Sequence, residues 1–214
     1  MTATYAPVPS PRFWDRIAAR YARQPVADET AYRRKLEVTQ SYFQPDWQVL
    51  ELGCGTGSTA LAHAPHVAHI LATDLSTRML EIGRSKAALA GVRNVTFRQA
   101  AVEDFDAPPE SFDAVLGLSL LHLLADERAA LAKIRGLLKP GGIFVSSTVC
   151  MKDMTGVFFR LILPVGRALR VFPMVRSFSA DTLRSNLRAA GFEIDHDWRP
   201  APGKALFLVA RKPA

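Results

Sequence analysis

A short glycine-rich stretch, E-L-G-C-G-T-G at residues 51–57, is followed about 20 positions later by an aspartate, Asp74. Glycines directly after a strand let the backbone turn sharply and approach a ligand closely, and the N-terminus of a helix behind them favours negative charge. An acidic residue at the tip of the next strand can accept hydrogen bonds from ribose hydroxyls. This spacing predicts a site for a nucleoside-containing cofactor.

The form of the glycine pattern narrows the choice of cofactor. It is G-x-G-x-G, whereas dinucleotide sites carry G-x-G-x-x-G and triphosphate-binding loops end in Gly-Lys-Ser/Thr. Glu51 stands two positions before the first glycine, where it would repel a pyrophosphate and attract a cation such as the ammonium of a methionine moiety. The motif therefore disfavours dinucleotides and nucleoside triphosphates.

Short apolar runs alternate with amphipathic helical patterns through the middle of the chain. Strands are predicted at residues 47–52, 69–73, 94–98, 112–119 and 143–149, and helices at 58–64, 76–90 and 126–138. Ser76 is the expected N-cap of the second helix, and K-P-G-G at 139–142 is expected to end the third helix. Strands separated by helices of about a dozen residues indicate an α/β fold with a mainly parallel sheet.

Both ends of the chain add to this core. Residues 13–43 carry two amphipathic helical runs separated by Pro25, and we expect residues 1–45 to form a tail and a helical lid over a core at 46–214. A helix at 179–190 and two strands at 192–197 and 205–211 complete the prediction, the last pair as an antiparallel hairpin.

Four stretches carry a family resemblance: V-L-E-L-G-C-G-T-G-S at 49–58, A-T-D-L-S-T-R-M-L at 72–80, S-F-D-A-V-L-G-L-S-L-L-H at 111–122 and L-L-K-P-G-G-I-F-V at 137–145. Together they resemble the class I S-adenosylmethionine-dependent methyltransferases, in particular small-molecule enzymes with a type 11 or type 25 domain. The resemblance implies a Rossmann-like, doubly wound sheet of seven strands whose last strand is antiparallel. It also implies S-adenosylmethionine as cofactor, S-adenosylhomocysteine as product and no metal.

The resemblance also implies a set of cofactor contacts, position by position. Glu51 would face the methionine ammonium; Gly53, Cys54, Gly55 and Gly57 would line methionine and ribose; Asp74 would hold the ribose hydroxyls; Leu75 and Met79 would flank the adenine; and Leu118 or Ser119 would offer a main-chain carbonyl to the amine. Tyr21, with Trp14 and Phe13 nearby, would cover the cofactor or else pack in the core. These contacts specify the cofactor and leave the substrate open.

One position departs from the family pattern. Such enzymes usually carry an aspartate before a small residue in the loop after the third strand, where this chain has Ala101 and Val102. Adenine would then be recognised by the Val102 backbone, or by Glu103 or Asp104.

The histidines offer one candidate general base. His122 follows the fourth strand, near the expected methyl group, and would either take a proton from a hydroxyl or amine acceptor or serve as a packing residue. His63, His66 and His69 have no matching carboxylate spacing and are expected at the surface.

Composition excludes several classes of protein. With 49% hydrophobic residues and no collagen or heptad repeat, the chain is an ordinary globular domain. The net charge of +7 favours an anionic partner without naming one. Cys54 and Cys150 form no ligand or disulfide pattern, which indicates a reducing, cytoplasmic location.

A substrate-side insertion is expected at about residues 151–178, where aromatic and aliphatic side chains alternate with arginines. Arginines within the apolar run 156–175 disfavour a transmembrane span, although contact with a membrane surface stays open. The insertion would bind an apolar or anionic substrate, or pack as a helix on its own core.

The predicted function is in-line methyl transfer to a small, apolar or anionic acceptor. S-L-L-H at 119–122 is not the Asn/Asp-Pro-Pro-Tyr/Phe motif of enzymes that methylate base amino groups, and no magnesium-binding set is apparent. The alternatives are an RNA or protein methyltransferase that docks through the positive charge, and a non-catalytic S-adenosylmethionine-binding protein.

Overall fold

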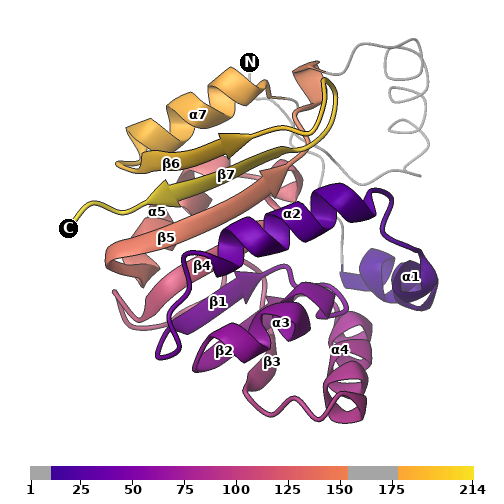
Figure 1. Ribbon diagram of the computed structural model, residues 1–214. Coiled ribbons are helices and arrows are strands. Elements are labelled where there is room, and N and C mark those ends of the chain that lie inside the picture. Colours follow the sequence, from indigo (N-terminus) through magenta and orange to yellow (C-terminus); the bar gives the residue numbers. More distant parts are fainter. Residues whose placement is uncertain (1–10, 154–177) are drawn as a thin grey trace.

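Seven strands form one sheet in the order β3-β2-β1-β4-β5-β7-β6 (Figure 1). The computed structural model describes residues 11–153 and 178–214. The strands are β1 (Gln48–Leu52), β2 (His69–Asp74), β3 (Val95–Gln99), β4 (Phe112–Leu118), β5 (Leu138–Thr148), β6 (Glu193–Trp198) and β7 (Leu206–Arg211). β7 lies antiparallel between β5 and β6, and the other neighbouring strands pair in parallel. The predicted Rossmann-like sheet, with its antiparallel last strand and final hairpin, is confirmed.

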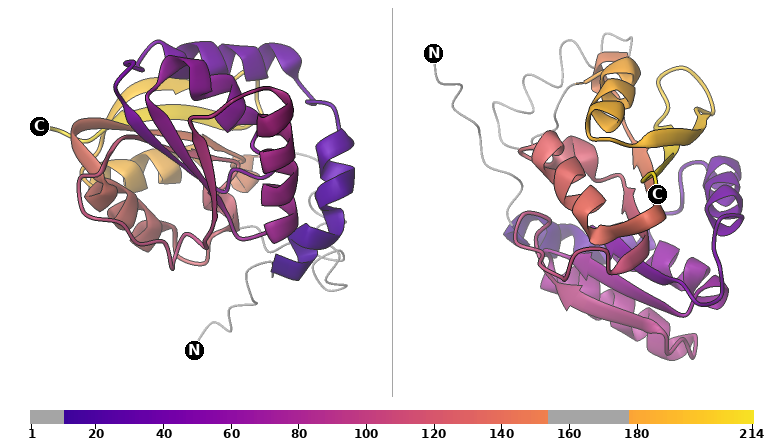
Figure 2. Two further views of the ribbon diagram at one scale, coloured as in Figure 1. Left: turned by 90° about the horizontal axis from the view of Figure 1, so that it is seen from below. Right: turned by 90° about the vertical axis from the view of Figure 1, so that its left-hand side faces the viewer.

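Helices cover both faces of the sheet (Figures 1 and 2). They are α1 (Pro11–Arg23), α2 (Glu29–Gln40), α3 (Ser58–His63), α4 (Thr77–Leu89), α5 (Glu127–Leu137) and α7 (Ala180–Ala189), with short 3-10 turns η1 (Ala64–His66), η2 (Leu121–Leu123) and η3 (Met151–Asp153). Val38, Ala60 and Leu80 bring α2, α3 and α4 into one apolar cluster, whereas Leu131 and Leu183 bring α5 and α7 into the other. The sheet therefore separates two hydrophobic cores.

The direction of winding reverses between β1 and β4. From β1 the chain moves outward through β2 to β3 on the α3 and α4 face, then returns to β4, which pairs with the free side of β1. A ligand crevice forms outside the carboxyl ends of the strands at such a reversal. The glycine-rich stretch and the residues after β4 both lie there.

The predicted N-cap at Ser76 is confirmed, since its hydroxyl accepts a hydrogen bond from the Met79 amide at 3.1 Å. The predicted boundary at residues 139–142 is half right. The helix does end there, but β5 begins directly at Leu138, five residues before the expected strand. Gly141 and Gly142 exchange backbone hydrogen bonds with Lys212, so β-pairing holds the Pro-Gly segment extended.

Two sequence expectations fall outside the described residues. The tail before Pro11 is one, and most of the insertion expected at about residues 151–178 is the other. Only its first turn, η3, and Phe178 belong to the part of the chain that the structure describes.

Candidate functional site

The loop between β1 and α3 turns through left-handed backbone at three glycines, Gly53, Gly55 and Gly57. Gly55 has a φ of +54°, and a Cβ placed on it would point toward the Tyr21 ring, 3.7 Å away. That direction is open for the close approach of a ligand. A Cβ on Gly57 would instead collide with Phe97 at 2.6 Å, so this glycine serves the packing of the loop on the sheet.

Asp74 ends β2 and ties this loop to the next helix. Its carboxylate accepts hydrogen bonds from the backbone amides of Gly55 at 2.9 Å and Ser76 at 2.8 Å. Each oxygen keeps a second lone pair that a hydroxyl can approach. Burial raises the pKa of Asp74, and the two amide donors oppose that rise. The side chain is therefore held in one orientation at the edge of a cavity.

Glu51 has a buried carboxyl group that is only partly satisfied. It is 3% exposed, and its Oε2 atom has no hydrogen-bond partner among the described residues. Burial, with Asp74 nearby, raises its pKa to about 8. A buried carboxyl oxygen without a donor calls for a ligand that supplies one.

Ser119, just after β4, has a φ of +56°, which is uncommon outside glycine. Such a conformation costs on the order of 1–3 kcal/mol and persists where surrounding contacts impose it. Here the Ser119 amide donates to the Ser147 carbonyl at 2.7 Å, which holds the turn against the end of β5. The strained residue lies at the point where the winding reverses.

Two cavities meet at this edge of the sheet. The first, which we call the Asp74 cavity, has a volume of about 380 Å³ and contains Asp74, Leu75, Met79, Ala101, Val102, Glu103, Trp14 and His122. The second, the Lys35 cavity, has a volume of about 570 Å³ and contains Glu51, Cys54 and Lys35. Tyr21, Gly53, Gly55, Leu118 and Ser119 line both.

Most residues that the sequence singles out therefore come together. Gly57 lies outside the described lining of both cavities, as does Asp104, which is exposed. The Cys54 thiol is buried, which raises its pKa and keeps it protonated.

The loop after β3, where the aspartate of the family pattern is missing, is held from the opposite side. Lys133 of α5 donates to the carbonyls of Val102, Glu103 and Phe105. Val102 is consequently buried, with its backbone at the wall of the Asp74 cavity. Spacing along the chain gives no sign of this long-range contact from Lys133.

His122 lies in η2 at the wall of the Asp74 cavity. Its Nδ1 atom is buried and has no partner among the residues the structure describes. Burial lowers its pKa to about 4, so the ring is neutral at neutral pH. A group with so low a pKa is a weak general base.

Helix α1 closes the site from outside and rests on α4 (Figure 1). Asp15 accepts hydrogen bonds from the Ser76 hydroxyl at 2.6 Å and the Arg78 amide at 3.1 Å. The pKa of Asp15 is lowered, mainly because the Ser76 hydroxyl donates a hydrogen bond to its carboxylate. Tyr21, 48% exposed, and Trp14 reach from this helix to the cavities, and Phe13 packs edge-on against Trp14 at 5.2 Å. Asp15 was not predicted as a site residue, because its partners at the N-terminus of α4 lie 61 and 63 positions further along the chain.

The expectation that His63 lies at the surface is wrong. His63 is 1% exposed, packs edge-on against Phe43 at 5.1 Å, and has a pKa lowered by burial to about 3. Helix α3 brings it inward together with Ala60 and Ala64, because four-residue spacing places these side chains on one face. His66 is exposed, and His69 bonds the Thr96 hydroxyl at the surface.

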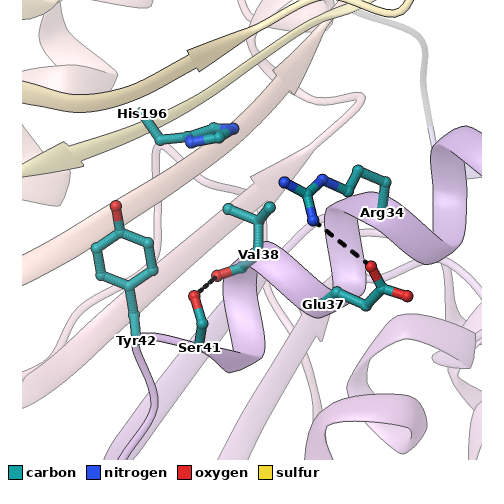
Figure 3. A pocket seen from close by; sticks show the side chains of 6 residues that line it. All are labelled: Arg34, Glu37, Val38, Ser41, Tyr42 and His196. Carbon is teal, nitrogen blue, oxygen red and sulfur yellow. Dashed lines mark hydrogen bonds and ion pairs between the residues drawn. The ribbon is translucent and has the colours of Figure 1, made fainter.

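A third hollow, of about 320 Å³, lies between α2 and β6 (Figure 3). Two of its polar groups are engaged within α2 and the residue after it: Arg34 pairs with Glu37 at 3.7 Å, and Ser41 donates to the Val38 carbonyl at 2.8 Å. It shares no lining residue with the glycine loop. We therefore do not include it in the candidate site.

Comparison with known proteins identifies the class. Residues 49–142 match a methyltransferase domain family. An uncharacterised methyltransferase, YcgJ of Bacillus subtilis, is 36% identical over 98 residues, which cover 46% of this chain and 39% of that protein. A demethylmenaquinone methyltransferase of Clavibacter sepedonicus is 34% identical over 144 residues, covering 67% of this chain and 50% of the relative. The matches thus span half or less of these relatives.

The solved structure of YcgJ superimposes with a TM-score of 0.70 at 21% identity, covering 85% of this chain and 99% of that one. This likeness establishes the fold. With the domain match and the motifs, the chain belongs to the class I S-adenosylmethionine-dependent methyltransferases. No helix within residues 11–153 and 178–214 is long and apolar enough to cross a membrane.

Proposed function

We propose that this protein binds S-adenosylmethionine and transfers its methyl group to a small-molecule acceptor. The observation that carries the proposal is the buried Glu51 carboxyl, whose Oε2 atom lacks a partner beside the glycine loop. An ammonium group donates the hydrogen bond that this oxygen lacks and compensates its buried charge. A neutral nucleoside alone would leave Glu51 unsatisfied.

The residues present fit this cofactor on both sides of the glycine loop. Asp74 would hold the ribose hydroxyls, Leu75 and Met79 would enclose the adenine, and Glu51 would face the methionine ammonium, with a Leu118 or Ser119 carbonyl as a further acceptor. Val102 and Glu103 line the same cavity, where the Val102 backbone or the Glu103 side chain would recognise the adenine. When bound, the cofactor supplies a methyl group that its sulfonium already activates for displacement.

The chain's own task is orientation. Fixed backbone at Gly55 and Ser119, both in left-handed conformation, holds the walls of the two cavities at their junction. Alignment of two reactants in such a site can lower a barrier by roughly 7–11 kcal/mol. Tyr21, which lines both cavities, and Trp14, which lines the Asp74 cavity, would cover the bound cofactor.

His122 is proposed as a positioning residue. Its ring is neutral because burial lowers its pKa to about 4, so it can donate one hydrogen bond and accept another across the neutral range. This role replaces that of a strong general base. It suits an acceptor that is already deprotonated or needs only orientation.

The acceptor is proposed to be an apolar ring compound or a small anion. One relative is named a demethylmenaquinone methyltransferase, and a quinol is such a ring compound. The Asp74 cavity also offers an apolar wall at Leu120, Leu123 and Leu124, close to His122. Nucleic acid has no comparable support in the site.

A methyl-transfer assay tests the proposal. Radiolabelled S-adenosylmethionine is incubated with quinols, phenols, amines and aromatic acids, and label transfer is measured for the wild type and for Asp74→Ala. We expect transfer to a small acceptor by the wild type and at least a tenfold loss in the variant. Transfer only to RNA or protein would overturn the small-molecule assignment, and cofactor binding without transfer to any class would favour the non-catalytic alternative.

A further inference from the structure

The Lys35 cavity extends well past the cofactor residues. From Glu51 and Ser119 it continues to the end of β5 at Ser147 and to Lys204 and Ala205, just before β7. Its volume of about 570 Å³ falls in the range of pockets that hold a whole small molecule. An amino-acid tail of a cofactor leaves much of this space unfilled.

A partly buried cation, Lys35, lines this space. Lys35 projects from the α2 face that also carries Tyr32 and Thr39, and its Nζ atom donates to the Ser147 hydroxyl at 2.8 Å. An ammonium group has three donor hydrogens, and this is its one acceptor among the described residues. Burial lowers the pKa of Lys35. Removing a cation from water without a counter-ion is costly.

The nearby carboxyl groups do not neutralise this cation. No carboxylate lies within ion-pair distance of Lys35 in the described part of the chain. The charge of Asp28 opposes the lowering of the Lys35 pKa, but the Asp28 carboxylate pairs with Lys204 at 3.7 Å. Glu51 has its pKa raised to about 8 and is mainly protonated at neutral pH. Lys86 adds a further positive charge, and its hydrogen bonds within the described residues go to the Thr56 and Ser58 hydroxyls. The cavity therefore presents an excess of positive charge.

We propose that Lys35 Nζ and the Ser147 hydroxyl form an oxyanion site that holds a carboxylate or phenolate group in the Lys35 cavity. This inference rests on the proposed function, because it places an acidic group of a methyl acceptor beside Ser119, where both cavities meet. The carboxylate of the cofactor's amino-acid tail offers the same chemistry. Lys35 is then a specificity-determining residue.

The experiment compares the wild type with Lys35→Met by isothermal titration, in two arms. In the first arm, each protein is titrated with S-adenosylhomocysteine and with 5′-methylthioadenosine, which lacks the carboxylate and the ammonium. In the second, each protein saturated with S-adenosylhomocysteine is titrated with 4-hydroxybenzoate and other aromatic acids, and with their neutral amides.

Each outcome decides the proposal. A loss of at least tenfold confined to the aromatic acids supports it and places the oxyanion on the acceptor. A loss of that size for S-adenosylhomocysteine alone, with 5′-methylthioadenosine and the aromatic acids unchanged, overturns it, because Lys35 would then hold the carboxylate of the cofactor and not an acceptor. Equal affinities of both proteins in both arms overturn it, whereas a wild type that binds neither nucleoside contradicts the proposed function instead.

Two further variants keep the test clear. Arg33→Met removes a charge from an exposed position of the same helix, outside the cavity lining, and is expected to bind like the wild type. Ser147→Ala retains the charge of Lys35 and removes one donor, so we expect a smaller loss, of about threefold to fivefold. If Lys35→Met fails to fold, an unchanged affinity in Ser147→Ala and a wild-type preference for amides over acids would overturn the proposal.

Discussion

The two cavities at the carboxyl edge of the sheet are built in different ways. In the Asp74 cavity, neighbouring backbone groups satisfy the key acid, since the Gly55 and Ser76 amides both donate to Asp74. In the Lys35 cavity, Glu51 Oε2 has no described partner and Lys35 has a single hydroxyl acceptor. The acid of the first cavity is satisfied before a ligand binds, whereas the second carries charged groups whose desolvation a ligand would offset.

The largest loss of cofactor affinity is expected from a substitution in the glycine loop that lines both cavities. Gly55→Val places a β-branched side chain at a φ of +54°, directed toward Tyr21 and into the ligand space. We expect S-adenosylhomocysteine binding to fall at least 100-fold in isothermal titration, while circular dichroism shows a folded domain. Binding at wild-type strength would mean that this loop does not cradle the cofactor.

Removing the Asp74 carboxylate should reduce cofactor affinity by a smaller factor than Gly55→Val. Asp74→Ala removes the proposed ribose acceptor and leaves the Gly55 and Ser76 amides without their bonds. We expect a loss in affinity of at least tenfold and a loss in stability of about 1–3 kcal/mol, measured by titration and by urea unfolding. An unchanged dissociation constant would remove Asp74 from the ribose site.

In the Lys35 cavity, Glu51 should make the stability of the protein depend on pH. Its folded pKa of about 8 lies above the ordinary value of 4.5, so the folded state holds a proton that the unfolded state releases between these values. The free energy of unfolding should therefore fall as pH rises from about 5 to 8, and Glu51→Gln should flatten that slope.

The same carboxyl should make cofactor binding pH-dependent in the opposite sense. An ammonium is best paired with a charged Glu51, so S-adenosylhomocysteine affinity should increase between pH 6 and 8 in the wild type and change much less in Glu51→Gln. Parallel pH profiles for the two proteins would show that Glu51 does not face the ligand's charge.

His122 tests the electrostatics of the Asp74 cavity through the protonation state of its ring. Because burial lowers its pKa to about 4, its ring nitrogens should remain in the neutral form from pH 8 to pH 5 in a nitrogen-15 NMR titration. A midpoint near the ordinary value of 6.5 would restore its candidacy as a strong general base.

The smallest effect is expected at the outer helix. Asp15→Ala removes the two hydrogen bonds that dock α1 on α4 and leaves the cavity walls intact. Hydrogen exchange in α1 should increase, and cofactor affinity should fall only about twofold to fivefold. Unchanged exchange would show that Asp15 does not hold the helix in place.

The Asp74 cavity and the Lys35 cavity also differ in how far they can be predicted from the sequence. The Asp74 cavity is predictable from local spacing, because a strand, a glycine loop and an acidic residue at the tip of the next strand take fixed relative positions through backbone geometry. The N-cap at Ser76 is likewise a local pattern, whereas the seven-stranded sheet with its antiparallel last strand was expected from the family resemblance. Lys35, Ser147 and Lys133 were not, since their contacts span 112 residues from Lys35 to Ser147 and 28 to 31 from Lys133 to the loop after β3. His63 was mispredicted because a polar side chain in a short helix gives no sign of the Phe43 ring that covers it.

The central claim is that the glycine loop, Glu51 and Asp74 form a cradle for S-adenosylmethionine. The most direct measurement is isothermal titration of the wild-type protein with S-adenosylmethionine and S-adenosylhomocysteine. We predict binding of both in a ratio of one to one with micromolar affinity, and loss of that binding in Asp74→Ala. Absence of binding to either nucleoside, also in the presence of quinols, phenols and aromatic acids, would contradict the account.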